Sequence, residues 1–523
     1  MRLATLDDLS ACGHAQADKN LSPTKRLSIT IPSFHVKNVY LIGIGGTGMS
    51  GLARLLLTKG YKVSGSDTQP SPTTFALEKL GARITNKQDG NGVNPETELV
   101  IISAAITEDN PDLMAARSFS LKVIKYSQFL GSLMKEKKGI AISGTHGKTT
   151  TTSMVSTVLK YAGMDPSFVI GGVVPEIGGS SHYGKGNFFV AEACEYDKSF
   201  LYLSPHIGVI TNIEEDHLDY YKNIEGVVNA FAEFATSIPE DGLLVVNNQD
   251  DNIKKAIKGA HCNIETYSMD DPFANWTATR LRWDNTFEVF HNGSPFGEFG
   301  LRIPGVHNVM NALATIATCT FAGVERQSIM EGLATFNGAQ RRFQIIDSVN
   351  GITIVDDYGH HPTEIRATLR AARERFPEGR IWCVFQPHQY SRTKLLLKDF
   401  ARSFGDADKV VLTDIFSARD SEEDKAAINS CILTNEARLQ GADALYIPHI
   451  DDVPDLLCSG LMPDDVVITM GAGDVWKVSR SLISKLHEHK SKASGDRGQE
   501  SRVWTHNPRL MTQDLNGILQ PAL

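Results

Sequence analysis

The strongest chemical signal in the sequence is a short glycine loop at residues 144–150, GTHGKTT. The apolar run GIAIS precedes it and a helical pattern follows, so the loop joins a strand to a helix. Backbone amides of such a loop bind phosphates, a lysine at Lys148 neutralises their charge, and the Thr149 hydroxyl can reach Mg²⁺. Only two residues separate Gly144 from Gly147, where the common phosphate loop has four. The predicted ATP-binding residues are Gly144, Thr145, His146, Gly147, Lys148, Thr149 and Thr150.

Two groups of acidic residues follow other apolar runs. The run FVAE ends at Glu192, and Glu195 and Asp197 come shortly after it. The run IGVITN leads into the segment EEDHLD around His217. Charge runs of this kind usually form solvated loops. Both groups, however, follow strand-like runs in the segment that holds the phosphate loop, and ligands of open α/β sheets bind at that edge. We therefore expect these groups to supply magnesium ligands.

A second glycine loop, G-I-G-G-T-G at residues 43–48, lies between a strand-like run and a helical pattern. A further strand-like run then ends in Ser-Asp, where an acid can bind a ribose hydroxyl. This context predicts a nucleotide or nucleotide-sugar site, with a merely structural turn as the alternative. NAD is the usual ligand, but such a loop recognises a diphosphate and not a nicotinamide. The residues of this site are Gly43, Gly45, Gly46, Gly48, Ser66 and Asp67.

Short β-branched runs alternate with helical patterns through the middle of the chain, which is typical of parallel-sheet α/β architecture. The expected strands include residues 39–44, 98–103, 139–143, 207–212, 380–385, 409–414 and 465–470. Several of them lead into polar or glycine-rich turns, which indicates three separate α/β units. We expect a loose leader at 1–35, domains at 36–136, 137–340 and 341–489, and a polar tail at 490–523.

The composition excludes several classes of protein. The 523 residues are 41% hydrophobic and carry a formal net charge of −9. No run approaches the roughly 18 apolar residues of a membrane span. Without a stripe of Lys and Arg, the acidic balance argues against a nucleic-acid or membrane-surface partner. The seven cysteines form no C-x-x-C pair, so we expect no disulfide framework, no cysteine zinc site and a cytoplasmic location.

Seven motifs, in order between about residues 36 and 485, resemble those of the Mur ligases. They are GTHGKTTTT, AEACEYD, TNIEEDHLD, PGVHNVMNALA, RRFQ, VDDYGHHPTEI and FQPHQYSRT. These ligases build the peptide stem of peptidoglycan by ATP-driven amide formation. The resemblance implies three α/β domains: a Rossmann-like UDP-binding domain, a central P-loop ATPase-like domain, and a C-terminal Rossmann-like domain for the amino acid. The loop at 43–48 would then hold the diphosphate of a UDP-sugar.

The resemblance also implies roles for single residues. Magnesium would be bound by Thr149, Glu192 and His217. ATP would be contacted by Lys148 and Arg342 at its phosphates and by Asp357 at its ribose, while His307 and Asn311 lie in the segment whose last Asn contacts adenine. The amino-acid site would be lined by Tyr358, His360, His388 and Arg392, and Ser103 would lie near the UDP-sugar.

The implied activity is the ATP-dependent joining of L-alanine to the carboxylate of UDP-N-acetylmuramate through an acyl phosphate, with ATP and Mg²⁺ as cofactors. The amine of alanine must lose a proton before it attacks, and His360 is the expected base or amine-positioning group. The expected partners are these small molecules, and the chain would be a monomer or a homodimer.

Some positions depart from the family pattern. Cys194 stands where Asp is common, Gln389 where many relatives have Arg, and SAAI at 103–106 replaces SSAI. The nearest alternative activity is the addition of a preformed tripeptide to the same UDP-sugar. A nicotinamide-dependent dehydrogenase would leave Lys148 unexplained. A regulator that binds ATP without chemistry conflicts with the intact set of Glu192, His217, Arg342 and Asp357.

Overall fold

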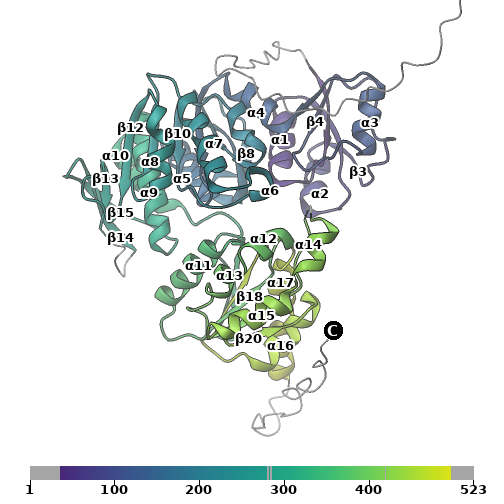
Figure 1. Cartoon of the computed structure of the whole chain (residues 1–523), viewed down its shortest axis with the longest axis vertical. Coiled ribbons are helices and arrows are strands. Elements are labelled where there is room, and N and C mark those ends of the chain that lie inside the picture. Colours follow the sequence, from purple (N-terminus) through teal and green to yellow (C-terminus); the bar gives the residue numbers. More distant parts are fainter. Residues whose placement is uncertain (1–35, 280–281, 283–284, 419, 496–523) are drawn as a thin grey trace, which may run out of the picture.

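The structure, a computed structural model, describes residues 36–279, 282, 285–418 and 420–495. The expected leader at 1–35 and the residues after 495 lie outside this described part. Three β-sheets form the framework. In Figure 1 the first two sheets lie side by side in an upper lobe, and the third forms a lower lobe. The expected class, α/β with three units, is confirmed.

The first sheet has the order β3-β2-β1-β4-β5, and all its strand pairs are parallel. Its strands are β1 (Asn38–Ile42), β2 (Lys62–Ser66), β3 (Arg83–Thr85), β4 (Leu99–Ile102) and β5 (Val123–Lys125). Its helices are α1 (Thr47–Thr58), α2 (Pro72–Lys79), α3 (Pro111–Ser118) and α4 (Tyr126–Met134). Helix α1 buries an apolar face that includes Met49, Leu52 and Leu56 against this sheet and its neighbour.

The second sheet has the order β15-β14-β13-β12-β11-β10-β6-β9-β7-β8. The central strands β7, β9, β6, β10, β11 and β12 run parallel. The edge strand β8 is antiparallel to β7, and β13 to β15 form an antiparallel extension at the other edge. The strands are β6 (Lys138–Ser143), β7 (Ser167–Val174), β8 (Gly179–His182), β9 (Phe188–Glu192), β10 (Ile207–Ile210), β11 (Leu243–Asn247), β12 (Asn263–Ser268), β13 (Trp276–Ala278), β14 (Thr286–His291) and β15 (Ser294–Gly300). The α-helices are α5 (Lys148–Tyr161), α6 (Leu218–Tyr221), α7 (Ile224–Ser237), α8 (Asp251–Ala256), α9 (Val306–Phe321) and α10 (Arg326–Thr335), and a short 3₁₀ segment, η2, spans Tyr196–Tyr202.

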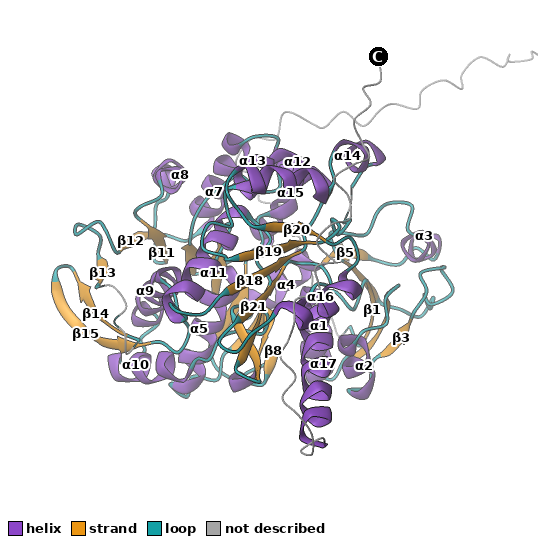
Figure 2. Ribbon diagram, turned by 90° about the horizontal axis from the view of Figure 1, so that it is seen from below, coloured by secondary structure: helices purple, strands orange, loops and turns teal. Residues whose placement is uncertain are grey.

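The third sheet has the order β16-β17-β21-β18-β19-β20, parallel except for the β16–β17 pair. Its strands are β16 (Gln344–Val349), β17 (Ile352–Asp357), β18 (Ile381–Phe385), β19 (Lys409–Leu412), β20 (Ala444–Tyr446) and β21 (Val466–Met470). Its helices are α11 (Pro362–Arg375), α12 (Tyr390–Leu395), α13 (Leu397–Ala401), α14 (Glu422–Ala427), α15 (Ser430–Leu439), α16 (Val453–Gly460) and α17 (Trp476–Gly495). Separate apolar cores fill the two faces of this sheet, and Figure 2 shows α12, α13 and α15 on one side and α16 and α17 on the other.

Every strand expected from the apolar runs is present, from β1 and β4 to β21. Each sheet is built within one of the expected segments, so we retain 36–136, 137–340 and 341–489 as proposed domain boundaries. The last helix, α17, continues to Gly495, past the expected start of the polar tail at 490. No helix in the described part of the chain is long and apolar enough to cross a membrane.

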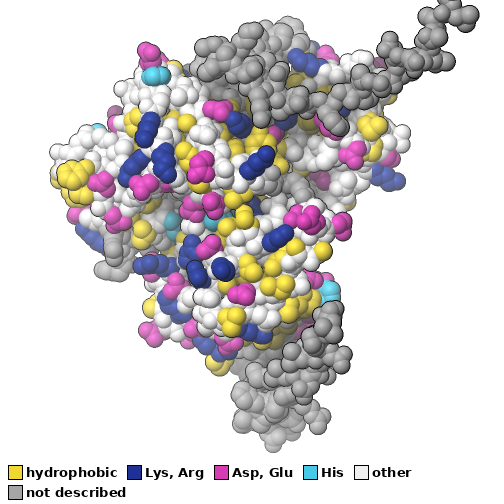
Figure 3. All heavy atoms as spheres, viewed as in Figure 1, with side chains coloured by type: hydrophobic (Ala, Val, Ile, Leu, Met, Phe, Trp, Pro, Cys, Tyr) yellow, Lys and Arg dark blue, Asp and Glu magenta, His cyan; other side chains and the backbone are white. Residues whose placement is uncertain are grey.

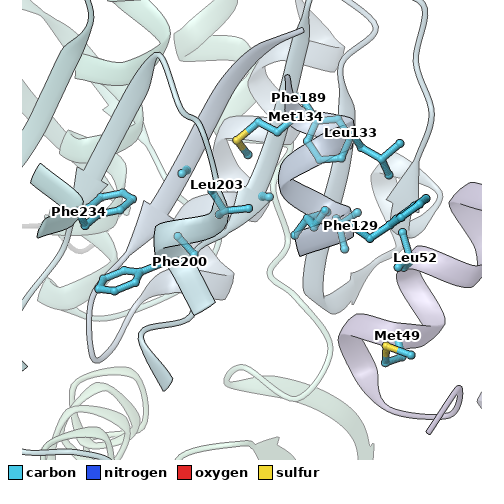
Figure 4. Close-up of a cluster of buried hydrophobic side chains, with 14 of the residues drawn as sticks. Met49, Leu52, Phe129, Leu133, Met134, Phe189, Phe200, Leu203 and Phe234 are labelled. Carbon is cyan, nitrogen blue, oxygen red and sulfur yellow. The ribbon is translucent and has the colours of Figure 1, made fainter. Parts of the chain in front are cut away.

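The first and central domains share one apolar core. Figure 4 shows Leu52 of α1 next to Phe129 of α4, with Phe189 of the central domain close by in the same cluster. The backbones also touch, because a Cβ on Gly131 of α4 would lie 2.1 Å from the carbonyl oxygen of Tyr202. These two domains are therefore packed as one body.

We expect the Leu52→Ala variant to loosen both of these domains. Leu52 is fully buried in the shared core, and removing such a side chain costs about 2–5 kcal/mol. Hydrogen exchange should rise in β9 and α7 as well as in α1, and should stay unchanged in β21. The matched Leu482→Ala variant removes a side chain from a core of the third sheet. In that variant exchange should rise in β21 and stay unchanged in α1, β9 and α7. Faster exchange in α1 alone would contradict a shared core.

Candidate active site between the central and C-terminal domains

The phosphate loop connects β6 to α5 and needs its glycines. Gly144 and Gly147 have φ angles of 134° and 81°. A Cβ on Gly144 would lie 1.9 Å from Oγ1 of Thr211, and one on Gly147 would lie 2.6 Å from Oδ1 of Asn311. No side chain caps α5, whose N-terminus follows Gly147. The first amides of the helix are thus free to bind an anion.

Lys148 is held at the start of α5 by a buried carboxylate. Its Nζ donates to the carbonyls of Gly144 and Thr145 and lies 3.0 Å from Oε2 of Glu195. Burial opposes the charge of Lys148, but Glu195, only 2% exposed, outweighs it and raises the lysine pKa. The ammonium is therefore charged and fixed next to the place that the loop offers to phosphates.

The three predicted magnesium ligands lie next to the phosphate loop or next to the carboxylate that holds Lys148. Oγ1 of Thr149 donates to Oε2 of Glu192 at 3.2 Å. His217 lies with its Nε2 3.9 Å from Oε1 of Glu195, the partner of Lys148. Its Nδ1 is buried without a hydrogen-bond partner. A hydroxyl, a carboxylate and an unsatisfied imidazole fit a divalent cation beside a phosphate group.

A cavity of about 250 Å³ lies next to the loop, between the central and C-terminal domains. In the space-filling view of Figure 3 a furrow separates the two lobes, with histidine side chains visible inside it. The predicted nucleotide-binding residues that line this cavity are His146, Gly147, Thr150, His307, Asn311, Arg342 and Asp357. The two domains therefore contribute jointly to one candidate nucleotide site.

Single residues of this cavity are firmly positioned. Burial lowers the pKa of His307 to about 4, so this ring is neutral at pH 7. Asn311 accepts a hydrogen bond from Thr151 at 3.2 Å and donates to Asn308 at 3.2 Å. The carboxylate of Asp357 accepts the amides of Phe343 and Gly359 at 2.7 and 2.6 Å. These bonds fix the amide and the carboxylate that face the expected adenosine.

Glu364, near the start of α11, joins the two domains. Its Oε1 accepts from Nδ1 of His146 at 3.1 Å and lies 3.7 Å from Nη1 of Arg342. Its Oε2 accepts the amides of His360 and His361 at 2.8 and 3.2 Å. Burial alone would raise the pKa of Glu364, but the neighbouring His360, His146 and Arg342 hold it well below its usual range. This carboxylate is thus ionised at the seam between the domains.

The four predicted amino-acid-binding residues form a continuous row. The ring centroids of Tyr358 and His360 are 5.6 Å apart, and those of His360 and His388 are 5.9 Å apart. Nη1 of Arg392 lies 3.3 Å from Nδ1 of His388, and Nη2 bonds Asp216 of the central domain at 3.0 Å. Arg392 and Asp216 line a second cavity of about 310 Å³, together with His217. Arg392 of the expected amino-acid site and His217 of the expected metal site therefore border one space.

The glycine loop at 43–48 lies in the first domain. The amide of Gly45 donates to Oδ2 of Asp67 at 2.8 Å, and a Cβ on Gly45 would lie 2.7 Å from the same oxygen. Helix α1 begins after Gly46 without a side-chain cap. Ser103 borders the loop, since its Oγ would lie 3.3 Å from a Cβ on Gly43, whereas Ser66 is fully buried. Gly48 packs against Tyr126.

Two functional residues were not singled out by the sequence reasoning. Glu195 was one acid in a group of candidates, and nothing in its spacing shows that it binds Lys148. Glu364 was overlooked, although a local signal exists. The segment HPTE places an acid three residues after His361, which is the pattern of a capping box. The neighbouring Arg341 forms an ion pair with Asp356, with Nε and Oδ2 3.0 Å apart.

Together, a phosphate loop, a nucleotide cavity closed by a second α/β domain and a further glycine loop define a multidomain ATP-using α/β enzyme. Comparison with known families gives three matches: "Mur ligase family, catalytic domain" at residues 38–138, "Mur ligase middle domain" at 142–319, and "Mur ligase, glutamate ligase domain" at 341–473. The chain belongs to the Mur ligase family and is therefore an ATP-dependent ligase.

Particular relatives are similar over nearly their whole length. The chain is 44% identical over 465 residues to the UDP-N-acetylmuramate–L-alanine ligase of Acetivibrio thermocellus, covering 88% of this chain and 98% of that one. For the enzyme of the same name from Clostridium novyi the identity is 45% over 451 residues, covering 86% and 97%. Among solved structures, the UDP-N-acetylmuramate-alanine ligase of Thermotoga maritima superposes with a TM-score of 0.75 at 28% identity, covering 86% and 99%. A murein peptide ligase of Psychrobacter arcticus reaches 0.67 at 26%, covering 86% and 98%.

The seam between the domains should weaken at alkaline pH. Burial opposes the charge of His146, but Glu364 and Glu214 outweigh it and raise its pKa to about 9. Since the unfolded value is lower, near 6.5, this stabilisation is complete below that pH and is lost as pH rises through about 9. The shift corresponds to about 3 kcal/mol. The fall in melting temperature between pH 7 and 10 should be larger for the wild type than for His146→Gln. Equal falls in melting temperature for the two proteins would contradict a stabilising charge on His146.

Proposed function

We propose that the chain joins L-alanine to the carboxylate of UDP-N-acetylmuramate, with ATP cleaved to ADP and phosphate. The observation that carries this proposal is the seam between the two domains. Asn311 of the central domain and Arg342 of the C-terminal domain line one cavity there, and His217 and Arg392 line a second one. The names of relatives that are 42–45% identical support the choice of substrates.

In the first step, a carboxylate oxygen of the sugar attacks the γ-phosphorus of ATP, the bond to the β-phosphate oxygen breaks, and ADP leaves. Two negatively charged groups must approach each other, so the step needs fixed positive charge. Lys148, held by Glu195, and Arg342, 3.7 Å from Glu364, supply it. Thr149, Glu192 and His217 would hold Mg²⁺, which offsets phosphate charge when bound.

In the second step, the amine of alanine attacks the acyl carbon, and the tetrahedral intermediate expels phosphate. The amine must give up a proton, and we assign this to His360. Burial lowers the pKa of His360 to about 4, so the ring is neutral at pH 7. Its Nδ1 lies 3.1 Å from the carbonyl of Tyr358, and a proton there leaves the lone pair on Nε2 free to accept one. Arg392 is the cation proposed for the alanine carboxylate.

The residues of the first domain are proposed to bind the UDP-sugar, with its diphosphate at the uncapped start of α1. We also propose a reducing, cytoplasmic location, because all six cysteines in the described part of the chain are free. A monomer or a homodimer would serve this reaction.

The direct test is phosphate release from ATP with UDP-N-acetylmuramate and either L-alanine or the L-alanyl tripeptide. We expect release with L-alanine only. Release with the tripeptide only would favour the alternative activity. No release with either amine would remove the proposed reaction.

Replacing Lys148 should separate chemistry from sugar binding. We expect Lys148→Ala to lower turnover by at least about 10²-fold, because it removes a fixed charge at the transferred phosphate. UDP-sugar affinity, measured by calorimetry, should remain, since the glycine loop lies in another domain. The double variant Lys148→Ala, Glu195→Gln avoids leaving a buried carboxylate without its cation. Equal loss of turnover and sugar affinity would contradict the domain roles.

Gly45→Ala should weaken binding of the UDP-sugar and leave binding of ATP intact. The added Cβ would lie 2.7 Å from Oδ2 of Asp67, so the loop must shift. We expect UDP-sugar affinity to fall at least about tenfold, which corresponds to 1.4 kcal/mol, while ATP affinity stays unchanged. Gly405→Ala is the matched control, because its Cβ would enter open space. Unchanged sugar affinity in Gly45→Ala would place the diphosphate elsewhere.

A further inference from the structure

Three side chains of types that can bind metals meet at the seam, and none of them performs a step of the proposed reaction. They are His146 of the phosphate loop, Glu214 after β10, and His361 at the start of α11. One ring nitrogen of each histidine and one carboxylate oxygen all lie within 4.8 Å of one another. Nε2 of His146 is 3.4 Å from Oε2 of Glu214, and Nδ1 of His361 is 3.8 Å from the same oxygen.

The two imidazoles have ligand atoms to spare. Nε2 of His146 and Nε2 of His361 are buried, and neither has a hydrogen-bond partner. His361 is only 5% exposed. Buried polar atoms are rarely left unsatisfied, because each costs about 1–3 kcal/mol. Nε2 of His361 is therefore open to a ligand. Nε2 of His146 faces Glu214 at 3.4 Å and would give up its proton when a metal ion binds.

The surroundings of His146 match those of a metal-bound histidine. Its Nδ1 donates to Oε1 of Glu364 at 3.1 Å, which fixes the ring and leaves Nε2 for another partner. A carboxylate behind the imidazole is the usual outer partner of a histidine that binds a metal. Glu214 is itself held by the hydroxyl of Thr363 at 2.7 Å. Two donor groups of the central domain are thus held in place by residues of the C-terminal domain.

We propose that His146, Glu214 and His361 bind a divalent transition-metal ion such as Zn²⁺. Two imidazoles and one carboxylate suit Zn²⁺ or Co²⁺ better than Mg²⁺, which prefers oxygen ligands. His146 and Glu214 line the nucleotide cavity, so a fourth position opens toward it. The site shares no residue with Thr149, Glu192 and His217, the proposed magnesium ligands.

The ion would link two domains that the chain otherwise joins by polar contacts. His146 and Glu214 belong to the central domain, and His361 belongs to the C-terminal domain. An ion held by residues of both lobes binds only when the lobes are together, and its binding therefore stabilises that closed arrangement. The consequence is a ligase whose opening depends on transition-metal concentration.

Binding is tested with metals alone, on the full chain without nucleotide. Co²⁺ in a four-coordinate site gives intense visible absorption, and Zn²⁺ should displace it. With excess Mg²⁺ present to fill the site at His217, we expect one Co²⁺ per chain, which Zn²⁺ displaces. The His361→Asn variant keeps a side chain that can cap α11 and removes the imidazole. His146→Gln removes the other. Each should lower Zn²⁺ affinity at least about tenfold.

Two controls separate this site from others. His217→Ala removes a proposed magnesium ligand and should leave Zn²⁺ affinity unchanged. His182→Asn alters a histidine that pairs with Asp165 at 2.9 Å on the far side of the central sheet, and should also have no effect. The proposal is overturned if the wild type binds no Co²⁺, if His361→Asn and His146→Gln bind Zn²⁺ as the wild type does, or if His217→Ala loses the ion.

Discussion

The active site depends on one buried charge, the carboxylate of Glu364. A carboxylate at this depth is costly unless cations and hydrogen bonds surround it. Arg342 and the amides of His360 and His361 belong to the same domain as Glu364, whereas His146 comes from the central domain, so the full set of partners exists only when the domains are together. The same contact places the phosphate loop against the residues that line the nucleotide cavity. Closure and assembly of the site are therefore one event.

The two interfaces of the chain differ in kind. The first and central domains share an apolar core in which Leu52 and Phe189 are fully buried. The C-terminal domain instead meets the central one through charged pairs, Glu364 with His146 and Arg392 with Asp216. Apolar burial holds surfaces together regardless of ligand, whereas polar pairs can exchange partners with water and substrates. The polar seam is thus the interface suited to open for substrate entry.

The sequence was sufficient for the features that are local. The phosphate loop, the strands before it and the glycines that need positive φ follow from short patterns around Gly144 and Gly147. The contact between His146 and Glu364 spans 218 residues, and no spacing rule covers such a distance. The ion pair between Lys148 and Glu195 also could not be predicted, because any acid of that group could have faced the loop. The antiparallel strands β13 to β15 lack the apolar runs that marked the parallel strands.

The central claim is that His146 and Glu364 act as one unit across the seam. A double-mutant cycle tests it: kcat/KM for ATP is measured for the wild type, His146→Gln, Glu364→Gln and the double variant. Side chains in direct contact couple by about 0.5–3 kcal/mol, and a buried charged pair belongs at the upper end. The account predicts that the double variant is at least about tenfold better than the product of the single effects, a coupling of 1.4 kcal/mol. Strictly multiplicative effects would contradict it.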